Sequence, residues 1–235
     1  MSVDPRRVPA AADLDPPTED TQRSLTVNAE MVRRLLPEFD QVSITLIDEA
    51  GGFFTCAQAG DTVRDLDRLQ YDLGEGPCID SLLAAEPVLA PRIERDERWR
   101  SYVSSATGLG LRSQIATPLM WREGSLLGAL NMYSTTREDV APTAPLIAQA
   151  LAVQIAGALA SLLEIENLHR AVATRKTIGM AIGLLMAQYE LTEAAAFAVL
   201  QRRSSHANVK LRDIAAQMVA EHCAAGLDLP SAATC

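Results

Sequence analysis

The feature that most constrains this chain is a long run without a charged residue, from Val140 to Leu163. Such a run is long enough to cross a bilayer, and in a water-soluble protein it has to contribute to a core. Its composition favours the core, because it is built from alanine rather than leucine, contains Pro142, Pro145 and two glutamines, and is flanked by acids without basic residues. We therefore predict a soluble helix with an apolar seam and no membrane span.

Charge is distributed unevenly along the 235 residues. The whole chain carries a formal net charge of −9 with a pI near 4.9, which argues against a protein that coats nucleic acid by bulk charge. Residues 168–225, however, carry seven basic and four acidic groups together with all three histidines. An acidic body with a mildly basic C-terminal segment predicts two modules with different partners.

Cysteine usage and the N-terminus indicate a cytoplasmic location. The four cysteines form no Cys-x-x-Cys pair, and the first residues lack the apolar core of a signal peptide. We expect reduced thiols, no metal and no cofactor. Numerous acids without a neighbouring histidine are expected to form a solvated acidic face; they are Asp61, Asp65, Asp67, Asp72 and Asp80.

Periodicity predicts an α+β N-terminal domain with a mixed, mainly antiparallel sheet flanked by helices. Alternating, β-branched runs with glycine-containing turns indicate two hairpins, and tight hairpins join antiparallel strands. The expected strands are 41–47, 53–60, 113–121 and 125–134, with an edge element at 88–93. The expected helices are 21–36, about 62–70 and 98–110.

From about 143 the pattern is helical to the end. A 4-3 spacing predicts a short apolar seam suited either to a dimer or to packing on the preceding domain; its members are Leu151, Ile155, Ala158, Leu162, Ile165, His169 and Val172. The first helix is expected to reach about Gln188. Thr192 is expected to cap a second helix that ends near His206, and Asn208 a third helix over 209–224. Together these helices predict a small three-helix bundle.

Two features of the bundle suggest a ligand surface. Gly179 and Gly183 leave one side of the helix bare, and each costs about 1 kcal/mol relative to alanine, so packing or a ligand has to offset that cost. Six basic residues cluster at helix ends and junctions: Arg175, Lys176, Arg202, Arg203, Lys210 and Arg212. As a group they predict a face that binds a polyanion.

This segment resembles the ANTAR domain, a three-helix RNA-binding output module of bacterial antiterminators. The resemblance covers about 165–222 and rests on three steps of the sequence; they are Arg175, Ile178, Ala181, Gly183, Leu185 and Met186, then Ala196, Phe197 and Leu200, then Ser204, Asn208, Lys210 and Leu211. The resemblance implies that the segment binds paired short hairpins in nascent transcripts. It also implies that Gly183 and Asn208 contact the RNA together with the six basic residues. Ile182 stands where many members have lysine, which removes one phosphate contact.

The N-terminal part, about 20–165, resembles a GAF domain, a small-molecule or redox-sensing module. The resemblance rests on LGEGPCIDSL (73–82), Arg98-Trp99, LRSQIATPL (111–119) and LLGALNMYS (126–134), in a form similar to sensors that precede ANTAR modules in high-GC Gram-positive bacteria. It implies a sensor pocket with contributions from Gly76, Cys78, Asp80, Trp99 and Arg112. Cys78 near a helix N-terminus is either a reactive thiolate or a small buried packing residue.

These observations predict a signal-responsive RNA-binding antitermination regulator that is not an enzyme and forms a homodimer. The expected organisation is a disordered tail (1–20), a sensor domain (21–142), a connector helix (143–167), an RNA-binding bundle (168–225) and a tail (226–235). Two alternatives stay open. One is a methionine sulfoxide reductase of the GAF fold that uses Cys56 and Cys78, and the other is an adaptor whose bundle binds a protein helix.

Overall fold

The computed structural model describes residues 17–48 and 50–226, which form two compact units. The first unit ends at Glu164 and the second begins at Ile165. The tails predicted at 1–20 and 226–235 lie mostly outside the described residues. The prediction of a disordered tail is wrong for Glu19 and Asp20, because both belong to a helix that the Thr18 hydroxyl caps.

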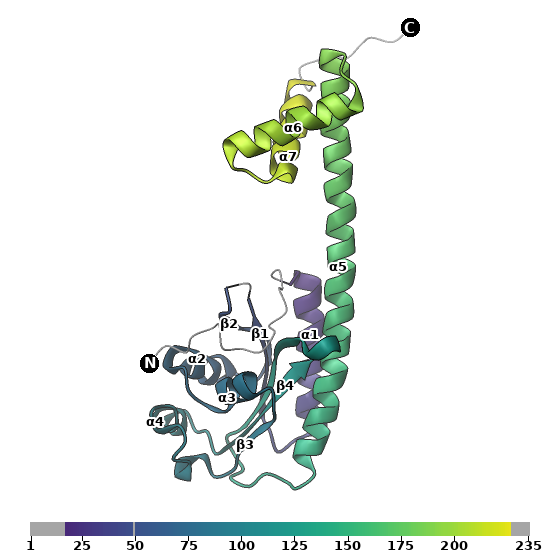
Figure 1. The fold of residues 1–235 in the computed structure, drawn as a ribbon. Coiled ribbons are helices and arrows are strands. Elements are labelled where there is room, and N and C mark those ends of the chain that lie inside the picture. The colour runs from purple at the N-terminus through teal and green to yellow at the C-terminus, as the bar shows by residue number, and fades with distance from the viewer. Residues whose placement is uncertain (1–16, 49, 227–235) are drawn as a thin grey trace. The chain divides into compact units, whose positions relative to one another are not determined.

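The N-terminal unit is built on a five-stranded sheet in the order β2-β1-β5-β4-β3 (Figure 1). Every pair of neighbours is antiparallel, as the two predicted hairpins require. The strands are β1 (Gln41–Ile47), β2 (Phe53–Ala59), β3 (Val88–Ala90), β4 (Ser113–Met120) and β5 (Leu126–Ser134). β5 is central and buried along its whole length, because both faces of the sheet are covered by helices.

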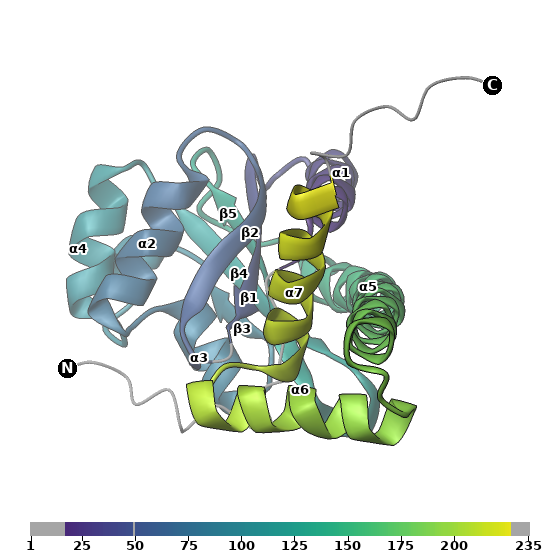
Figure 2. The ribbon, with the colours of Figure 1, turned by 90° about the horizontal axis from the view of Figure 1, so that it is seen from above.

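Helices form a layer on each side of the sheet (Figure 2). On one side, α1 (Glu19–Leu35) and the first part of α5 (Ala144–Tyr189) share one apolar cluster with β1, β2, β4 and β5. On the other side lie α2 (Val63–Leu73), α3 (Pro77–Ala84) and α4 (Arg100–Gly108), with short 3-10 turns at Ile93–Arg95 and Arg122–Gly124. The polar core described below lies between this second layer and the sheet.

Glycine at position 128 is needed for the close approach of the two central strands. Gly128 pairs with Leu46 across β5 and β1. A Cβ atom at Gly128 would lie 1.9 Å from the backbone oxygen of Thr45. That distance is far below van der Waals contact, so any side chain at this position forces the strands apart.

The helix α5 contains the uncharged run from Ala144 onward and contributes to both units. It is the one helix in the described part of the chain that is long and apolar enough to cross a membrane by length and composition. In the N-terminal unit its alanine-rich side is buried in the cluster with the sheet, through Ala144, Ala148, Ala152, Ile155, Ala156, Leu159 and Leu163. Small side chains let the helix approach the sheet closely, and this explains why alanine outnumbers leucine here.

The predicted 4-3 seam coincides with this buried side only in part. Leu151 and Ile155 pack into the sheet cluster, whereas Ala158 and Ile165 are exposed. The residues that lie against the sheet follow a spacing near 3.6, with a phase that differs from a strict heptad. Packing on the preceding domain therefore accounts for the first half of the seam and not for its second half.

The C-terminal unit consists of the end of α5, α6 (Glu193–Ala207) and α7 (Leu211–Gly226). Its core is small and formed by Ala181, Leu185, Ala196, Leu200 and Ala215. The predicted cap at Thr192 is confirmed, since its hydroxyl accepts a hydrogen bond from the Ala195 amide.

The predicted role of Asn208 as an N-cap is wrong. Asn208 lies after the last residue of α6 in the left-handed region, with φ 51° and ψ 40°, and its amide bonds the Ser204 and Ser205 carbonyls. Asparagine tolerates this conformation because its short polar side chain bonds locally. The last helix consequently begins at Leu211, two residues later than predicted.

Candidate functional site

A buried carboxyl group stands at the centre of a polar core between α2 and the sheet. Asp67 of α2 is fully buried and accepts hydrogen bonds from Ser43 Oγ (2.9 Å), Thr55 Oγ1 (2.6 Å) and the Tyr133 hydroxyl. Burial raises the pKa of Asp67 to about 6, and the hydrogen bond from Thr55, followed by those from Tyr133 and Ser43, opposes that rise. Burial dominates because it penalises the charged form of a carboxyl group.

The network continues from Asp67 across the helical layer. Gln70 Nε2 donates to the Tyr133 hydroxyl at 2.9 Å, and Gln70 Oε1 accepts from Gln114 Nε2 and from the backbone amide of Cys78. The Tyr102 hydroxyl donates to Gln114 Oε1 at 2.7 Å. These bonds tie α2, α3 and α4 to β4 and β5.

A second arm of the network involves Tyr71 and Asn131. Asn131 Nδ2 donates to Thr45 Oγ1 at 2.8 Å and to Ser43 Oγ at 3.3 Å. Thr45 Oγ1 and the Tyr71 hydroxyl share a hydrogen bond of 2.7 Å. Burial raises the pKa of Tyr71 well above its ordinary value, with Asp67 contributing in the same direction, so its hydroxyl stays a neutral donor and acceptor.

The prediction that Asp67 belongs to a solvated acidic face is wrong. Helical spacing places Asp67 on the same side of α2 as Val63 and Gln70, and all three are buried. That spacing is the signal in the sequence that identifies Asp67, because a carboxylate one turn from a buried valine faces the core. The same-face rule also selects Gln70, which the sequence reasoning did not single out.

Cys78 lies in the first turn of α3, as predicted, but the thiol is fully buried. Its Sγ lies 3.9 Å from Thr45 Oγ1. Burial, and next the negative charge of Asp67, raises the pKa of Cys78 to about 12. A reactive thiolate at neutral pH is inconsistent with this environment, so the structure favours the packing alternative.

The five residues predicted to form a sensor pocket lie in different surroundings. Cys78 and Trp99 are buried in two different apolar clusters, and Arg112 is exposed. Gly76 caps α3 with φ 130°, and a Cβ there would lie 2.6 Å from Gln70 Oε1, so glycine is required for the turn itself. Beneath the helices, the side chains of Cys78 and Trp99 pack against other side chains of this chain.

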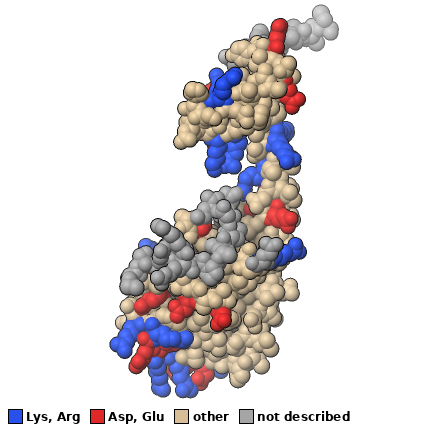
Figure 3. Space-filling view, in the orientation of Figure 1, with Lys and Arg blue, Asp and Glu red and all other residues tan. Residues whose placement is uncertain are grey.

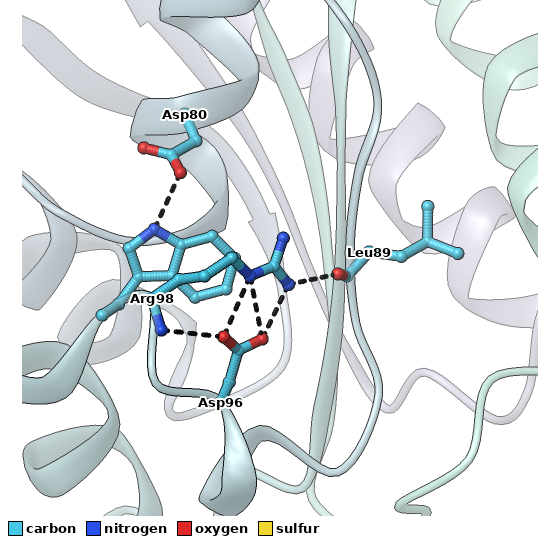
Figure 4. A network of polar contacts seen from close by, with 5 residues as sticks. Asp80, Leu89, Asp96 and Arg98 are labelled. Carbon is cyan, nitrogen blue, oxygen red and sulfur yellow. Dashed lines mark hydrogen bonds and ion pairs between the residues drawn. The ribbon is translucent and has the colours of Figure 1, made fainter.

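Asp80 and Trp99 are brought together, in a clasp that also includes Arg98 and Asp96 (Figure 4). Trp99 Nε1 donates to Asp80 Oδ2 at 2.9 Å, and the Arg98 guanidinium lies 4.0 Å over the Trp99 ring. Arg98 also bonds both carboxylate oxygens of Asp96 and the Leu89 carbonyl. These contacts join α3, the loop before α4 and β3, so the clasp positions the helical layer.

The predicted RNA-contacting residues are exposed on the C-terminal unit. Among the residues that the structure describes, five of the six basic side chains form no ion pair; they are Arg175, Lys176, Arg202, Arg203 and Lys210. Arg212 pairs with Asp213 at 3.6 Å. Figure 3 shows Lys and Arg on several parts of the visible face of this unit, with some acidic side chains among them. Exposed cations without acidic partners are available to bind phosphate.

The bare side of α5 is open in the single chain. A Cβ atom added at Gly179 or at Gly183 would have nothing within 4 Å. Packing inside the described chain therefore does not offset the cost of these two glycines. Arg175 precedes Gly179 by one turn, so the open side is headed by a basic residue.

The family comparisons agree with both resemblances. A GAF domain model matches residues 25–160 and an ANTAR domain model matches residues 166–219. The chain belongs to the GAF domain family and carries an ANTAR domain after the GAF domain. This pair of domains is the organisation of a sensor-regulated RNA-binding regulator, and both domains are typical of soluble cytoplasmic proteins.

Solved structures with the same fold as the N-terminal unit come from proteins of several kinds. A domain of a putative two-component sensor histidine kinase from Sinorhizobium meliloti is 21% identical, with a TM-score of 0.51 over 63% of this chain and 96% of that chain. A type II free methionine-R-sulfoxide reductase from Thermoplasma acidophilum is 16% identical, with a TM-score of 0.50 over 62% and 96%. No curated protein sequence matches this chain. At these identities the likeness concerns the fold alone.

Proposed function

We propose that this chain is a signal-responsive antitermination regulator that binds paired hairpins in nascent RNA and stabilises them against terminator formation. The observation that carries the proposal is the exposed set of basic side chains without acidic partners on the ANTAR unit, together with the open glycine side of α5, which Arg175 precedes by one turn. Single-stranded loops suit such a surface, because their unstacked bases are accessible while the phosphates meet the basic residues.

The regulatory step is a shift between two states of the GAF domain. A small-molecule or redox signal that favours one packing of the helical layer acts on the network around Asp67 and so on the elements that join it. The chain acts as a homodimer in the cytoplasm, through the exposed apolar residues of α5; they are Ile165, Leu168 and Val172. Two copies present two ANTAR units to two hairpins.

Catalysis is not part of the proposal. The likeness to the free methionine-R-sulfoxide reductases concerns the fold, and Cys78 is buried with a pKa of about 12. A thiol that attacks a sulfoxide has to be accessible and has to reach the thiolate state. Turnover of free methionine sulfoxide by the purified chain, lost in Cys78→Ser, would establish the enzyme instead.

Mobility shifts of RNA hairpins with the full chain, at several salt concentrations, test the proposed function. With about three to five phosphate contacts, the logarithm of affinity is expected to fall with the logarithm of salt at a slope of about −2 to −4. Arg175→Ala/Lys176→Ala is expected to weaken binding and to reduce the slope by about 1 to 2. Arg23→Ala/Arg68→Ala removes two exposed arginines of the N-terminal unit and serves as the matched control. Binding that is independent of salt, or equal effects of both double variants, contradicts RNA binding by the ANTAR unit.

A further inference from the structure

The C-terminal unit contains a hollow that is lined by only one of the predicted RNA-binding residues, Arg203. It lies between the end of α5, α6 and α7, and its volume is about 570 Å³. That volume is in the range of sites that hold small organic molecules, about 300 to 1,000 Å³. We call this hollow, lined at its base by Leu185, Leu191, Val199 and Met218, the three-helix groove.

Five polar or aromatic side chains surround the apolar base of the three-helix groove; they are Gln188, Tyr189, Arg203, Glu221 and His222. All five are exposed, and Tyr189 keeps 58% of its surface accessible at the end of α5. An apolar base with an accessible aromatic ring favours a flat, aromatic guest. The surrounding amide, guanidinium, imidazole and carboxylate groups supply donors and acceptors for the edge of such a guest.

A second hollow of about 500 Å³ adjoins the three-helix groove and shares Arg203, Met218 and Glu221 with it. Its other polar residues include His206 and Gln217. Gln217 Nε2 donates to Glu221 Oε1 at 2.9 Å, which orients the shared carboxylate. The two hollows are therefore adjacent along α6 and α7. Such an arrangement suits a polymer whose neighbouring units bind in neighbouring hollows.

We propose that the three-helix groove takes one unstacked base from the loop of the bound RNA, with the base against Tyr189 and its edge toward Gln188 and Glu221. This inference rests on the proposed function and deepens it by assigning the base-reading site. Charge favours RNA over an apolar peptide, because Arg203 lines both hollows and forms no ion pair among the described residues, so its guanidinium is available to a phosphate next to the base. Phosphate contacts position an RNA without reading its sequence, so a separate site for a base gives the unit its specificity.

The test uses the full chain and RNA hairpins with randomised loops, selected for binding to it. Stacking of a base on an aromatic side chain corresponds to about a 5- to 150-fold effect on affinity when the aromatic is removed. Tyr189→Ala is expected to cause a loss in that range, and Tyr189→Phe to restore most of the affinity. Neither change is expected to alter the salt slope, because neither removes a charge. Gln201→Ala, an exposed position of α6 outside both hollows, is the matched control.

Abasic substitution at each loop position of the selected hairpin identifies the base that enters the groove. At one loop position, removing the base and replacing Tyr189 by alanine are expected to be non-additive. The two changes together should reduce RNA affinity by about as much as the larger single change alone. At the same position, 2-aminopurine fluorescence is expected to be quenched by the wild-type chain and by Tyr189→Phe, and not by Tyr189→Ala.

Three outcomes contradict the assignment, and each has a different meaning. Salt-dependent hairpin binding that Tyr189→Ala leaves unchanged, with no coupled loop position, overturns the groove assignment and leaves the proposed function standing. A selection that yields no hairpin bound by the full chain overturns the proposed function and the groove assignment with it. Binding of an apolar peptide that Tyr189→Ala abolishes, with RNA affinity unchanged, also overturns the assignment in favour of a protein partner.

Discussion

Replacing Asp67 by asparagine removes the one buried carboxyl group at the centre of the GAF polar core. The asparagine oxygen keeps the position that accepts from Ser43 and Tyr133, and its amide group meets Thr55 Oγ1, which can accept. The change therefore removes the charge while leaving a hydrogen-bonded side chain of nearly the same shape. Its main effect is on the pH dependence of stability.

The magnitude follows from the raised pKa of Asp67. A shift from 3.8 to about 6 is roughly two units, which is worth about 3 kcal/mol of stability. Because the folded state holds this proton more tightly than the unfolded state, stability falls as the pH rises from about 4 to about 6, and the loss is complete above that range. The asparagine side chain has no proton to lose, so Asp67→Asn is expected to gain about 3 kcal/mol relative to wild type between pH 4 and pH 7.

Urea denaturation followed by tryptophan fluorescence measures this difference in the correct domain. The chain has two tryptophans, Trp99 and Trp121, and both lie in the GAF domain. Carboxyl groups with lowered pKa values, such as Asp96 beside Arg98, give the opposite pH dependence but are common to both proteins and cancel in the difference. Parallel stability curves for wild type and Asp67→Asn from pH 4 to pH 7 would refute the reasoning.

Three further outcomes follow from the structure. Cys78 is expected to resist iodoacetamide at pH 7 until the GAF domain unfolds, and rapid selective labelling in the native protein, detected by mass spectrometry, contradicts its burial. Gly128→Ala is expected to lower the free energy of unfolding by about 1 to 3 kcal/mol, because a Cβ would overlap the Thr45 carbonyl; an unchanged urea midpoint contradicts the strand spacing. Val172→Glu is expected to leave the fold intact and to convert the dimer to monomer in light scattering, because Val172 is 66% exposed; a wild-type monomer at high micromolar concentration ends the dimer proposal.

The sheet was predictable from the sequence because its signals are local. Alternating β-branched residues with glycine-containing turns place β1 at Gln41–Ile47 as predicted, and the other long strands to within a residue at each end. The antiparallel arrangement follows from the same hairpins. The short edge strand β3 was also found, since its apolar run is bounded by prolines.

The polar core was not predictable in the same way, because it is assembled from residues far apart in the chain. Asp67 meets Ser43, Thr55 and Tyr133 only after α2 has packed on the sheet. Counting acids in a segment treats Asp67 like its exposed neighbour Asp65, and only the helical phase separates them. Motif membership likewise does not indicate which side chains are buried, as Cys78 and Trp99 are.

In the C-terminal unit, one cap predicted from the sequence is confirmed and another is wrong. The Thr192 cap follows from a local rule, and the structure has it. Asparagine is favoured both as the N-cap of a helix and as the left-handed residue that follows a helix. Asn208 takes the second position, and there the Ser204 hydroxyl donates a hydrogen bond to the Val209 carbonyl. The three-helix groove could not be read from the sequence, because its lining comes from three helices and depends on how they pack.

Ultraviolet crosslinking of the full chain to RNA in the cells that make it, followed by peptide mapping, tests the central claim most directly. The account predicts RNA attached to peptides of the ANTAR unit, at the end of α5 and in α6, with the adduct lost in Arg175→Ala/Lys176→Ala and kept in Arg23→Ala/Arg68→Ala. Absence of crosslinked RNA, or adducts confined to the GAF domain, would contradict it.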